Sequence, residues 1–203
     1  ANALRLNWED VVPKGKLNYI MGNPPFVGAS MMTKLQKEEA VSIFGKGKRV
    51  NSIDYVGAWY HKAAALLENT VVKAAFVSTN SITQGEQVAP LWEKLLNIYK
   101  VHIDFAYRTF KWNSEAKEKA AVHCVIIGFS NAYNTHPKYI YTNGVTRQEA
   151  QNINPYLVDA PDILISSRGS ALCDVPRMTK GNQPSDGGNL ILSQKERDEL
   201  LSK

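Results

Sequence analysis

Residues 17–26 of the chain are Leu17-Asn18-Tyr19-Ile20-Met21-Gly22-Asn23-Pro24-Pro25-Phe26. A short apolar run that ends in glycine and two prolines is typical of a buried strand followed by a rigid, non-helical loop. Each proline favours an extended backbone at the residue before it, so Asn23 and Pro24 should both be extended. The stretch therefore predicts a strand over residues 17–21 and a loop that presents an amide side chain, free carbonyl groups and an aromatic ring.

This loop has the groups needed to hold a flat molecule that bears an NH2 group. The side-chain oxygen of Asn23 and the carbonyl oxygen of Pro24 can each accept one of its N–H bonds, and the ring of Phe26 can cover its face. The alternative is a strand end with a proline turn and a phenylalanine in the core. The residues alone leave both interpretations open.

The pattern on the C-terminal side of this loop alternates between helices and strands. It predicts helices over residues 33–44, 54–69 and 86–99, and strands over 71–78, 101–107, 120–129 and 139–142. Asp54 is expected to cap the second helix, and Gly45 to end the first. This order predicts an α/β fold with a mostly parallel sheet. Since no helix joins the two long strands 101–107 and 120–129, the second should run antiparallel at the end of the sheet.

The character of the chain changes at about Gly144. Four proline breaks and several glycines follow, and a capping-box pattern at residues 193–196 predicts a last helix. We therefore predict two units, residues 1–145 and residues 146–203.

Composition narrows the class of protein without identifying it. The chain has 203 residues, is 44% hydrophobic and carries a net charge of +5, which is compatible with a phosphate backbone as partner but not diagnostic of one. Its basic clusters can equally be solvated loop charges. No apolar run is long enough to span a membrane and no signal segment begins the chain, so we expect no membrane association.

The two cysteines, Cys124 and Cys173, lie far apart and form neither a disulfide framework nor a metal-ligand pattern. We therefore expect no metal and a reducing cytoplasm. Cys124 stands in an apolar run and should be a buried thiol. The sequence has no Pro-Cys pair, which argues against methylation at cytosine carbon 5 by an attacking cysteine.

Residues 22–26 resemble motif IV of the S-adenosylmethionine-dependent amino-methyltransferases, which modify adenine N6 or cytosine N4 in DNA. Longer stretches, at residues 22–29, 54–59, 75–87 and 108–112, resemble the MmeI-type restriction-modification enzymes. In that family one polypeptide carries endonuclease, adenine methyltransferase and target recognition. The resemblance covers most of the chain, in order.

The resemblance implies a fold and a division into domains. The chain would hold the C-terminal part of a doubly wound class I methyltransferase sheet, mostly parallel and with its last strand antiparallel. Residues 1–145 would be the C-terminal portion of the catalytic domain, and residues 146–203 the connection to an incomplete target recognition domain. The parent would be a single polypeptide in the bacterial cytoplasm.

The resemblance also implies roles for particular residues. Asn23, Pro24, Pro25 and Phe26 would be catalytic, with Phe26 stacking on the target base. A second ring, Phe110 or alternatively Trp112, would cover the other face of the base. Asn2 would contact the cofactor, and Arg108 and Lys111 would contact DNA.

The reaction implied is methyl transfer from S-adenosylmethionine to adenine N6 in double-stranded DNA. Most of the cofactor pocket would lie outside this chain, because no glycine-rich loop precedes residue 17. The piece alone would then be inactive. Two alternatives remain: methylation of an RNA base or a protein glutamine amide, and a DNA-binding specificity module that has lost methylation.

Overall fold

The computed structural model describes residues 2–45, 50–111, 123–132, 136–143, 146–176 and 191–202. It divides into two compact units, Ala1–Ser167 and Arg168–Lys203. The second unit contains the helix α5 (Gln194–Leu201), whose N-cap Ser193 forms the predicted capping box with Glu196. No helix in the described ranges is long and apolar enough to cross a membrane.

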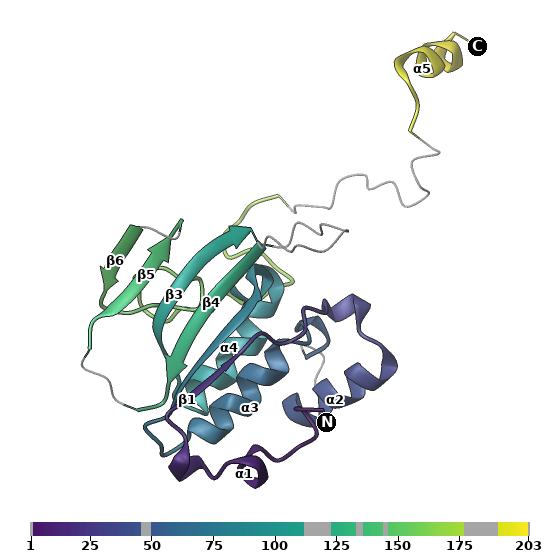
Figure 1. Ribbon diagram of the computed structural model, residues 1–203. Helices are drawn as coiled ribbons and strands as arrows, with labels where there is room; N and C mark the ends of the chain where they lie inside the picture. Colours follow the sequence, from purple (N-terminus) through teal and green to yellow (C-terminus); the bar gives the residue numbers. More distant parts are fainter. Residues whose placement is uncertain are drawn as a thin grey trace. The chain divides into compact units, whose positions relative to one another are not determined.

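The first unit is an α/β structure with one six-stranded sheet (Figure 1). Its elements are α1 (Trp8–Val11), β1 (Tyr19–Gly22), α2 (Lys34–Phe44), α3 (Gly57–Leu67), β2 (Lys73–Thr79), α4 (Val88–Asn97), β3 (His102–Lys111), β4 (His123–Ser130), β5 (Lys138–Thr142) and β6 (Thr146–Ala150). Two short 3-10 turns, Asn80–Thr83 and Gly85–Gln87, connect β2 to α4. The α/β class predicted from the sequence is confirmed.

The strand order is β1-β2-β4-β3-β5-β6, and most strands point the same way. β1 is parallel to β2, β4 is antiparallel to both β2 and β3, β5 is parallel to β3, and β6 is antiparallel to β5. The antiparallel direction of β4 was predicted correctly. Its place at the end of the sheet was not, since β4 lies between β2 and β3.

The burial of β4 explains this central place. Cys124, Val125, Ile127 and Phe129 are all fully buried. A strand with so much apolar surface is stabilised most where it has a strand on each side and a covered face.

The core lies between the sheet and the helices α3 and α4, which cover one face of the sheet (Figure 1). Tyr60 of α3 stacks on Phe129 of β4 at 5.2 Å between ring centroids, and it meets Phe76 and Trp92 edge to face. Aromatic burial of this kind fixes how the helices sit on the sheet, and therefore where the loops at the strand ends begin.

Two local predictions were wrong. β1 was expected to be buried, but its alternate side chains Tyr19 and Met21 are 66% and 79% exposed, and within the described residues the strand pairs only with β2. α3 begins at Gly57 with Val56 as its N-cap, and no side chain caps it, so Asp54 is not the cap. β6 and α1 were not predicted at all, because both are short and mostly polar.

The predicted end of α2 at Gly45 is confirmed, and its start has a capping box that was not predicted. Thr33 and Gln36 form a capping box, and Gly45 closes the helix with a φ of 79° that favours glycine.

Candidate functional site

The Asn23–Phe26 loop leaves the sheet at the carboxyl end of β1. Asn23 is exposed, Pro24 is buried, Pro25 is exposed and Phe26 is half-buried. The buried proline anchors the loop, whereas the asparagine before it is exposed.

Two consecutive residues before α3 tether the far end of this loop. The backbone N–H of Tyr55 donates to the carbonyl of Val27 at 2.9 Å, and the backbone N–H of Ala29 donates to Oδ1 of Asp54 at 2.9 Å. A further bond from the N–H of Val27 to the carbonyl of Pro25, at 3.2 Å, tightens the turn. The residues that follow Asn23 are therefore held in a defined path.

Phe110 lies at the same edge of the sheet as this loop. β4 is antiparallel to both of its neighbours, so β3 runs in the same direction as β1 and β2. Phe110 pairs with Cys124, which also pairs with Thr79 at the end of β2. Three strand spacings separate β1 from β3, which places the two strand ends about 14 Å apart.

The end of β3 is shaped by an irregularity in the register between Tyr107 and Phe110. Such a shift re-aims the side chains that follow it. Phe110 is half-buried. Trp112, the alternative stacking residue, lies outside the described residues.

The two predicted DNA-contacting residues differ in their surroundings. Arg108 is half-buried, and its Nε donates to the backbone carbonyl of Leu157 at 2.9 Å. Leu157 is itself buried and has a positive φ of 57°. Arg108 therefore ties the end of β3 to the segment after β6, whereas Lys111 is exposed at the strand end.

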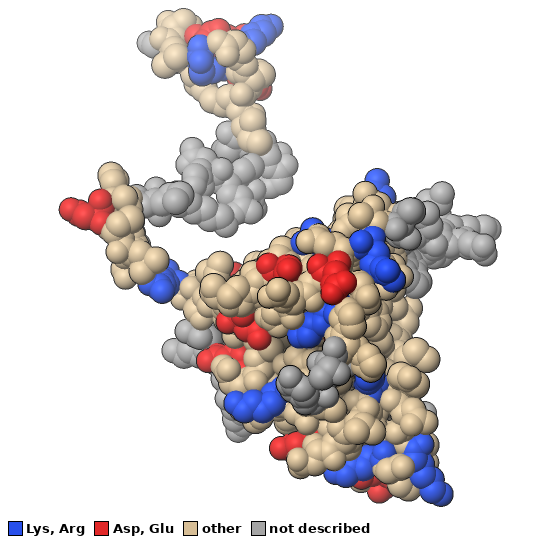
Figure 2. All heavy atoms as spheres, turned by 90° about the vertical axis from the view of Figure 1, so that its left-hand side faces the viewer, with Lys and Arg blue, Asp and Glu red and all other residues tan. Residues whose placement is uncertain are grey.

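Charge is mixed on the β6 side of the molecule. Figure 2 shows Lys and Arg interspersed there with Asp and Glu. On this side, the drawn residues do not gather into one basic patch.

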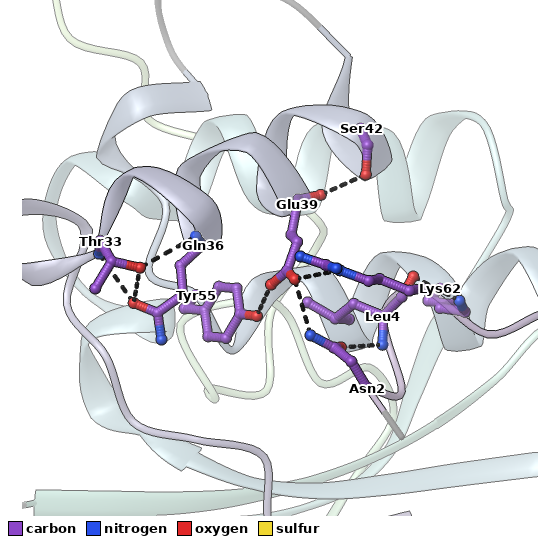
Figure 3. Close-up of polar contacts among 9 residues, drawn as sticks. Asn2, Leu4, Thr33, Gln36, Glu39, Ser42, Tyr55 and Lys62 are labelled. Carbon is purple, nitrogen blue, oxygen red and sulfur yellow. Dashed lines mark hydrogen bonds and ion pairs between the residues drawn. The ribbon is translucent and has the colours of Figure 1, made fainter.

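Asn2, the predicted cofactor contact, belongs to a polar cluster around the buried carboxylate of Glu39 (Figure 3). Its Nδ2 donates to Oε1 of Glu39 at 2.8 Å, and its Oδ1 accepts from the N–H of Leu4 at 2.9 Å. The Nε of Arg5 donates to the same carboxylate at 2.7 Å. Both polar atoms of the Asn2 side chain therefore have a partner within the chain, and a cofactor contact of Asn2 stays a prediction.

Tyr55 completes the cluster by donating its hydroxyl to Oε2 of Glu39. This bond is the main cause that lowers the pKa of Glu39, against the opposing effect of burial, and Arg5 and Asn2 lower it further. Burial and the bond to Glu39 raise the pKa of Tyr55 to about 12. The cluster was missed from the sequence, although Glu39 stands four residues from both Leu35 and Ile43, on a row where an apolar residue would be expected.

Other reactive side chains are structural. His61 is buried, its ring contacts Phe44 and Tyr99 edge to face, and burial with a smaller effect of Lys94 lowers its pKa to about 4. Cys124 is a buried thiol, as predicted, and burial raises its pKa. Among the described residues, no group of three or more His, Cys, Asp or Glu could hold a metal ion.

Comparison with known proteins decides the family. Residues 1–142 match the family model of the MmeI DNA-methyltransferase domain. The chain belongs to the MmeI methyltransferase family. Residues 159–203 match the model of the MmeI target recognition domain, so both parts of the resemblance noted in the sequence are confirmed.

Two relatives match the whole chain. One is the protein named DNA methyltransferase A from Bacillus subtilis (strain 168), which is 42% identical over 205 residues; the match covers 100% of this chain and 23% of that protein. The other is the solved structure of the type IIL restriction-modification enzyme MmeI in complex with DNA, with 44% identity and a TM-score of 0.90, covering 100% of this chain and 28% of that one. The chain thus spans about a quarter of the length of these relatives.

The two MmeI family models leave residues 143–158 between them. In the structure this segment packs with the first unit: β6 pairs with β5, and Ile153 forms an isolated bridge with Ile103. The compact unit extends to Ser167, beyond the boundary at 145/146 that the sequence suggested.

Proposed function

We propose that this chain is the amine-binding part of an enzyme that transfers a methyl group to the exocyclic N6 of adenine in double-stranded DNA, within a restriction-modification polypeptide of bacterial cytoplasm. One observation carries the proposal. This chain belongs to a DNA-methyltransferase family, and its Asn23 is exposed at the start of a loop whose other end is hydrogen-bonded to Asp54 and Tyr55.

Asn23 and Pro24 act on the target amine by accepting its two N–H bonds. An exocyclic amine is a weak nucleophile because its lone pair is delocalised into the ring. Holding both N–H groups favours a pyramidal nitrogen whose lone pair points away from the ring plane. Positioning of this kind contributes roughly 7–11 kcal/mol in well-oriented reactions.

Phe26 and Phe110 act on the faces of the base. An adenine must leave the duplex before it can enter such a site, which costs a few kcal/mol. Stacking on an aromatic ring returns about 1–3 kcal/mol for each base. The common edge at which β1 and β3 end supports a role for both rings, with Trp112 as the alternative to Phe110.

The methyl donor in this proposal is S-adenosylmethionine, which supplies an electrophilic methyl group when bound. Asn2 was expected to touch its adenine, but the amide of Asn2 is bonded to Glu39 and to the Leu4 N–H. The amide keeps a second N–H and a second lone pair, so Asn2 stays a proposed cofactor contact, and most of the pocket would lie outside this chain. The 203 residues alone should then bind the cofactor poorly and show no turnover.

The two alternatives make different demands on the protein. A methyltransferase of RNA bases or glutamine amides needs the same asparagine and prolines, but the match to a target recognition domain at residues 159–203 favours DNA. A module that has lost methylation would not need to keep Asn23 exposed at the end of a tethered loop.

The experiment compares Asn23→Ala with Asn18→Ala in a polypeptide of the relatives' full length. Both asparagines are exposed and flank β1, one at each end, so the chemical change is matched. We expect Asn23→Ala to abolish methyl transfer to duplex DNA while leaving DNA affinity intact, and Asn18→Ala to change neither. Near-normal turnover of Asn23→Ala would overturn the proposal.

A further inference from the structure

Asp54 occupies the point where the Asn23–Phe26 loop meets the rest of the first unit. Its position three residues before α3 suggests a helix cap, yet Val56 is the N-cap and no side chain caps the helix. The Asp54 carboxylate points elsewhere: Oδ1 accepts from the backbone N–H of Ala29 at 2.9 Å. A carboxylate that accepts a backbone N–H makes a charge-assisted bond, which is stronger than a neutral one.

The other carboxylate oxygen of Asp54 binds the segment that follows β2. Oδ2 accepts from the hydroxyl of Ser81 at 2.5 Å and, more weakly, from that of Thr79 at 3.4 Å. The Thr79 and Ser81 hydroxyl oxygens also lie 2.7 Å apart, and since each hydroxyl has one proton, Thr79 donates either to Ser81 or to Asp54. The backbone N–H of Asp54 donates to Oε1 of Gln87, in the turn before α4, at 3.0 Å.

One side chain therefore joins the segment that follows the Asn23–Phe26 loop, at Ala29, to the segment that follows β2, at Ser81. Residues 23–28 have no regular secondary structure of their own, so the path of this loop depends on such tethers. The bond to Ala29 and the bond from Tyr55 to Val27 come from consecutive residues, and together they fix the loop over three positions. Loss of the Asp54 bond removes one of these two tethers.

We propose that Asp54 is a positioning residue for methyl transfer: through Ala29 and Ser81 it fixes the loop that carries Asn23 and Phe26 against the end of β2. This rests on the proposed function of Asn23. Asp54 acts on the reaction through the loop and does not itself touch the target amine. Small displacements of a reacting group cost about 10²-fold in rate, so the effect should appear in kcat and not in DNA affinity.

The test measures kcat, KM for duplex DNA and thermal melting for Asp54→Ala, Asp54→Asn and Ser81→Ala in the full-length polypeptide. We expect Asp54→Ala to lower kcat about 10²-fold with little change in KM. Asp54→Asn should recover much of the loss, because its amide oxygen can still accept from Ala29 while its NH2 group meets the Ser81 hydroxyl. Ser81→Ala, which removes only the support of Oδ2, should lower kcat roughly fivefold, since it loosens the carboxylate without freeing Ala29.

Thr33→Ala is the matched control, because Thr33 is a true helix cap. The hydrogen bonds of its side chain go to Gln36 and not to residues 23–29. It should lower the melting temperature without lowering kcat. If Asp54→Ala does not fold, the kcat of Ser81→Ala still tests the positioning role.

The outcomes separate the two proposals. The positioning role would be overturned if Ser81→Ala and Asp54→Ala both kept a normal kcat. It would also be overturned if Asp54→Asn lost as much kcat as Asp54→Ala. If Asp54→Ala does not fold, normal kcat in Ser81→Ala alone overturns it. Absence of methyl transfer in the unchanged protein, or full activity of Asn23→Ala, would instead overturn the proposed function.

Discussion

Glu39 shows what a single buried carboxylate does for this fold. It accepts hydrogen bonds from Tyr55, Arg5 and Asn2, which come from the segment before α3 and from the N-terminal segment. Lys62 of α3 holds the same N-terminal segment by donating to the carbonyl of Leu4 at 2.8 Å. The N-terminal residues are thus fixed to α2 and α3 by two charged groups of opposite sign.

The first expected result concerns Glu39→Gln. Because the folded pKa of Glu39 lies below its usual 4.5, the carboxylate stabilises the fold fully above pH 4.5 and loses this effect as the pH falls through the folded pKa. Bonds to a charged group contribute about 1.5–3 kcal/mol, so Glu39→Gln should be less stable by about that amount at pH 7. Thermal or urea unfolding between pH 3 and pH 7 measures this difference, which should shrink below pH 4.5.

Glu38→Gln is the control, because Glu38 is the exposed neighbour on the same helix. It should leave stability unchanged across the range. A Glu39→Gln difference that does not depend on pH would contradict the role given to the charge.

His61 sets a second pH dependence, at higher pH. Its folded pKa of about 4 lies below the usual 6.5, so the unfolded chain takes up a proton first and stability falls as the pH drops from about 6.5 to about 4. The full loss is roughly 3 kcal/mol. Urea unfolding of the unchanged protein should show this slope, and His61→Leu should reduce it to the part that His102 contributes, because burial lowers the pKa of His102 as well.

His136, which is exposed, serves as the control for His61. His136→Leu should keep the slope between pH 6.5 and pH 4. If His61→Leu kept it as well, the buried imidazole would not be its source.

At the scale of elements, the start of α3 is the tightest contact in the helical layer. A Cβ at Gly57 would lie 2.6 Å from Cγ2 of Ile53 and 3.2 Å from side-chain atoms of Leu91 and Phe44. These three residues are almost fully buried, so they have little room to move. The glycine allows α3 to approach α2 and α4 closely.

We therefore expect Gly57→Ala to destabilise the fold by about 1–3 kcal/mol, although alanine is the better helix former. Gly15→Ala is the control, because nothing lies within 4 Å of its added Cβ. Chemical unfolding of both variants measures the difference. Equal stability of Gly57→Ala and the unchanged protein would show that the layer adjusts at no cost.

The sequence predicts the elements well where local rules decide them. Thr33, Gln36 and Gly45 define both ends of α2 by local hydrogen bonding and backbone preference, and the capping box of α5 was equally readable. The loop after β1 was predicted from two prolines, which act through their own geometry.

The parts that could not be predicted depend on partners far away in the sequence. The Asp54 carboxylate binds Ala29 and Ser81, which lie 25 and 27 residues away, so a pattern that resembles a cap gave the wrong role. The central place of β4 depends on pairing across the whole sheet. Asn2 was assigned from a family resemblance, and its contact with Glu39 became visible only in three dimensions.

At the scale of the whole molecule, the core belongs to the first unit. Every buried hydrophobic residue among those described lies between Leu4 and Leu157. In the described part of the second unit every residue is exposed, including Leu172, Ile191 and Leu201. Among the described residues, the buried apolar side chains therefore all belong to the first unit.

We expect a chain ended after Ser167 to melt at the same temperature as the 203-residue chain. A chain ended after Asn143 is the contrast: it lacks β6, Ile153 and Leu157, and should melt lower. Differential scanning calorimetry measures both. If the chain that ends after Ser167 melted more than about 4 °C lower, which corresponds to roughly 1 kcal/mol or more, the second unit would support the core.

The central claim is that the Asn23 loop serves methyl transfer to an adenine amine in duplex DNA. The most direct measurement is mass spectrometry of the nucleosides from a DNA duplex that has been incubated with the full-length polypeptide and S-adenosylmethionine. We expect N6-methyladenine as the product with the unchanged protein, and none with Asn23→Ala. Methylation found on cytosine, only on RNA or on a glutamine peptide, or retained in Asn23→Ala, would contradict it.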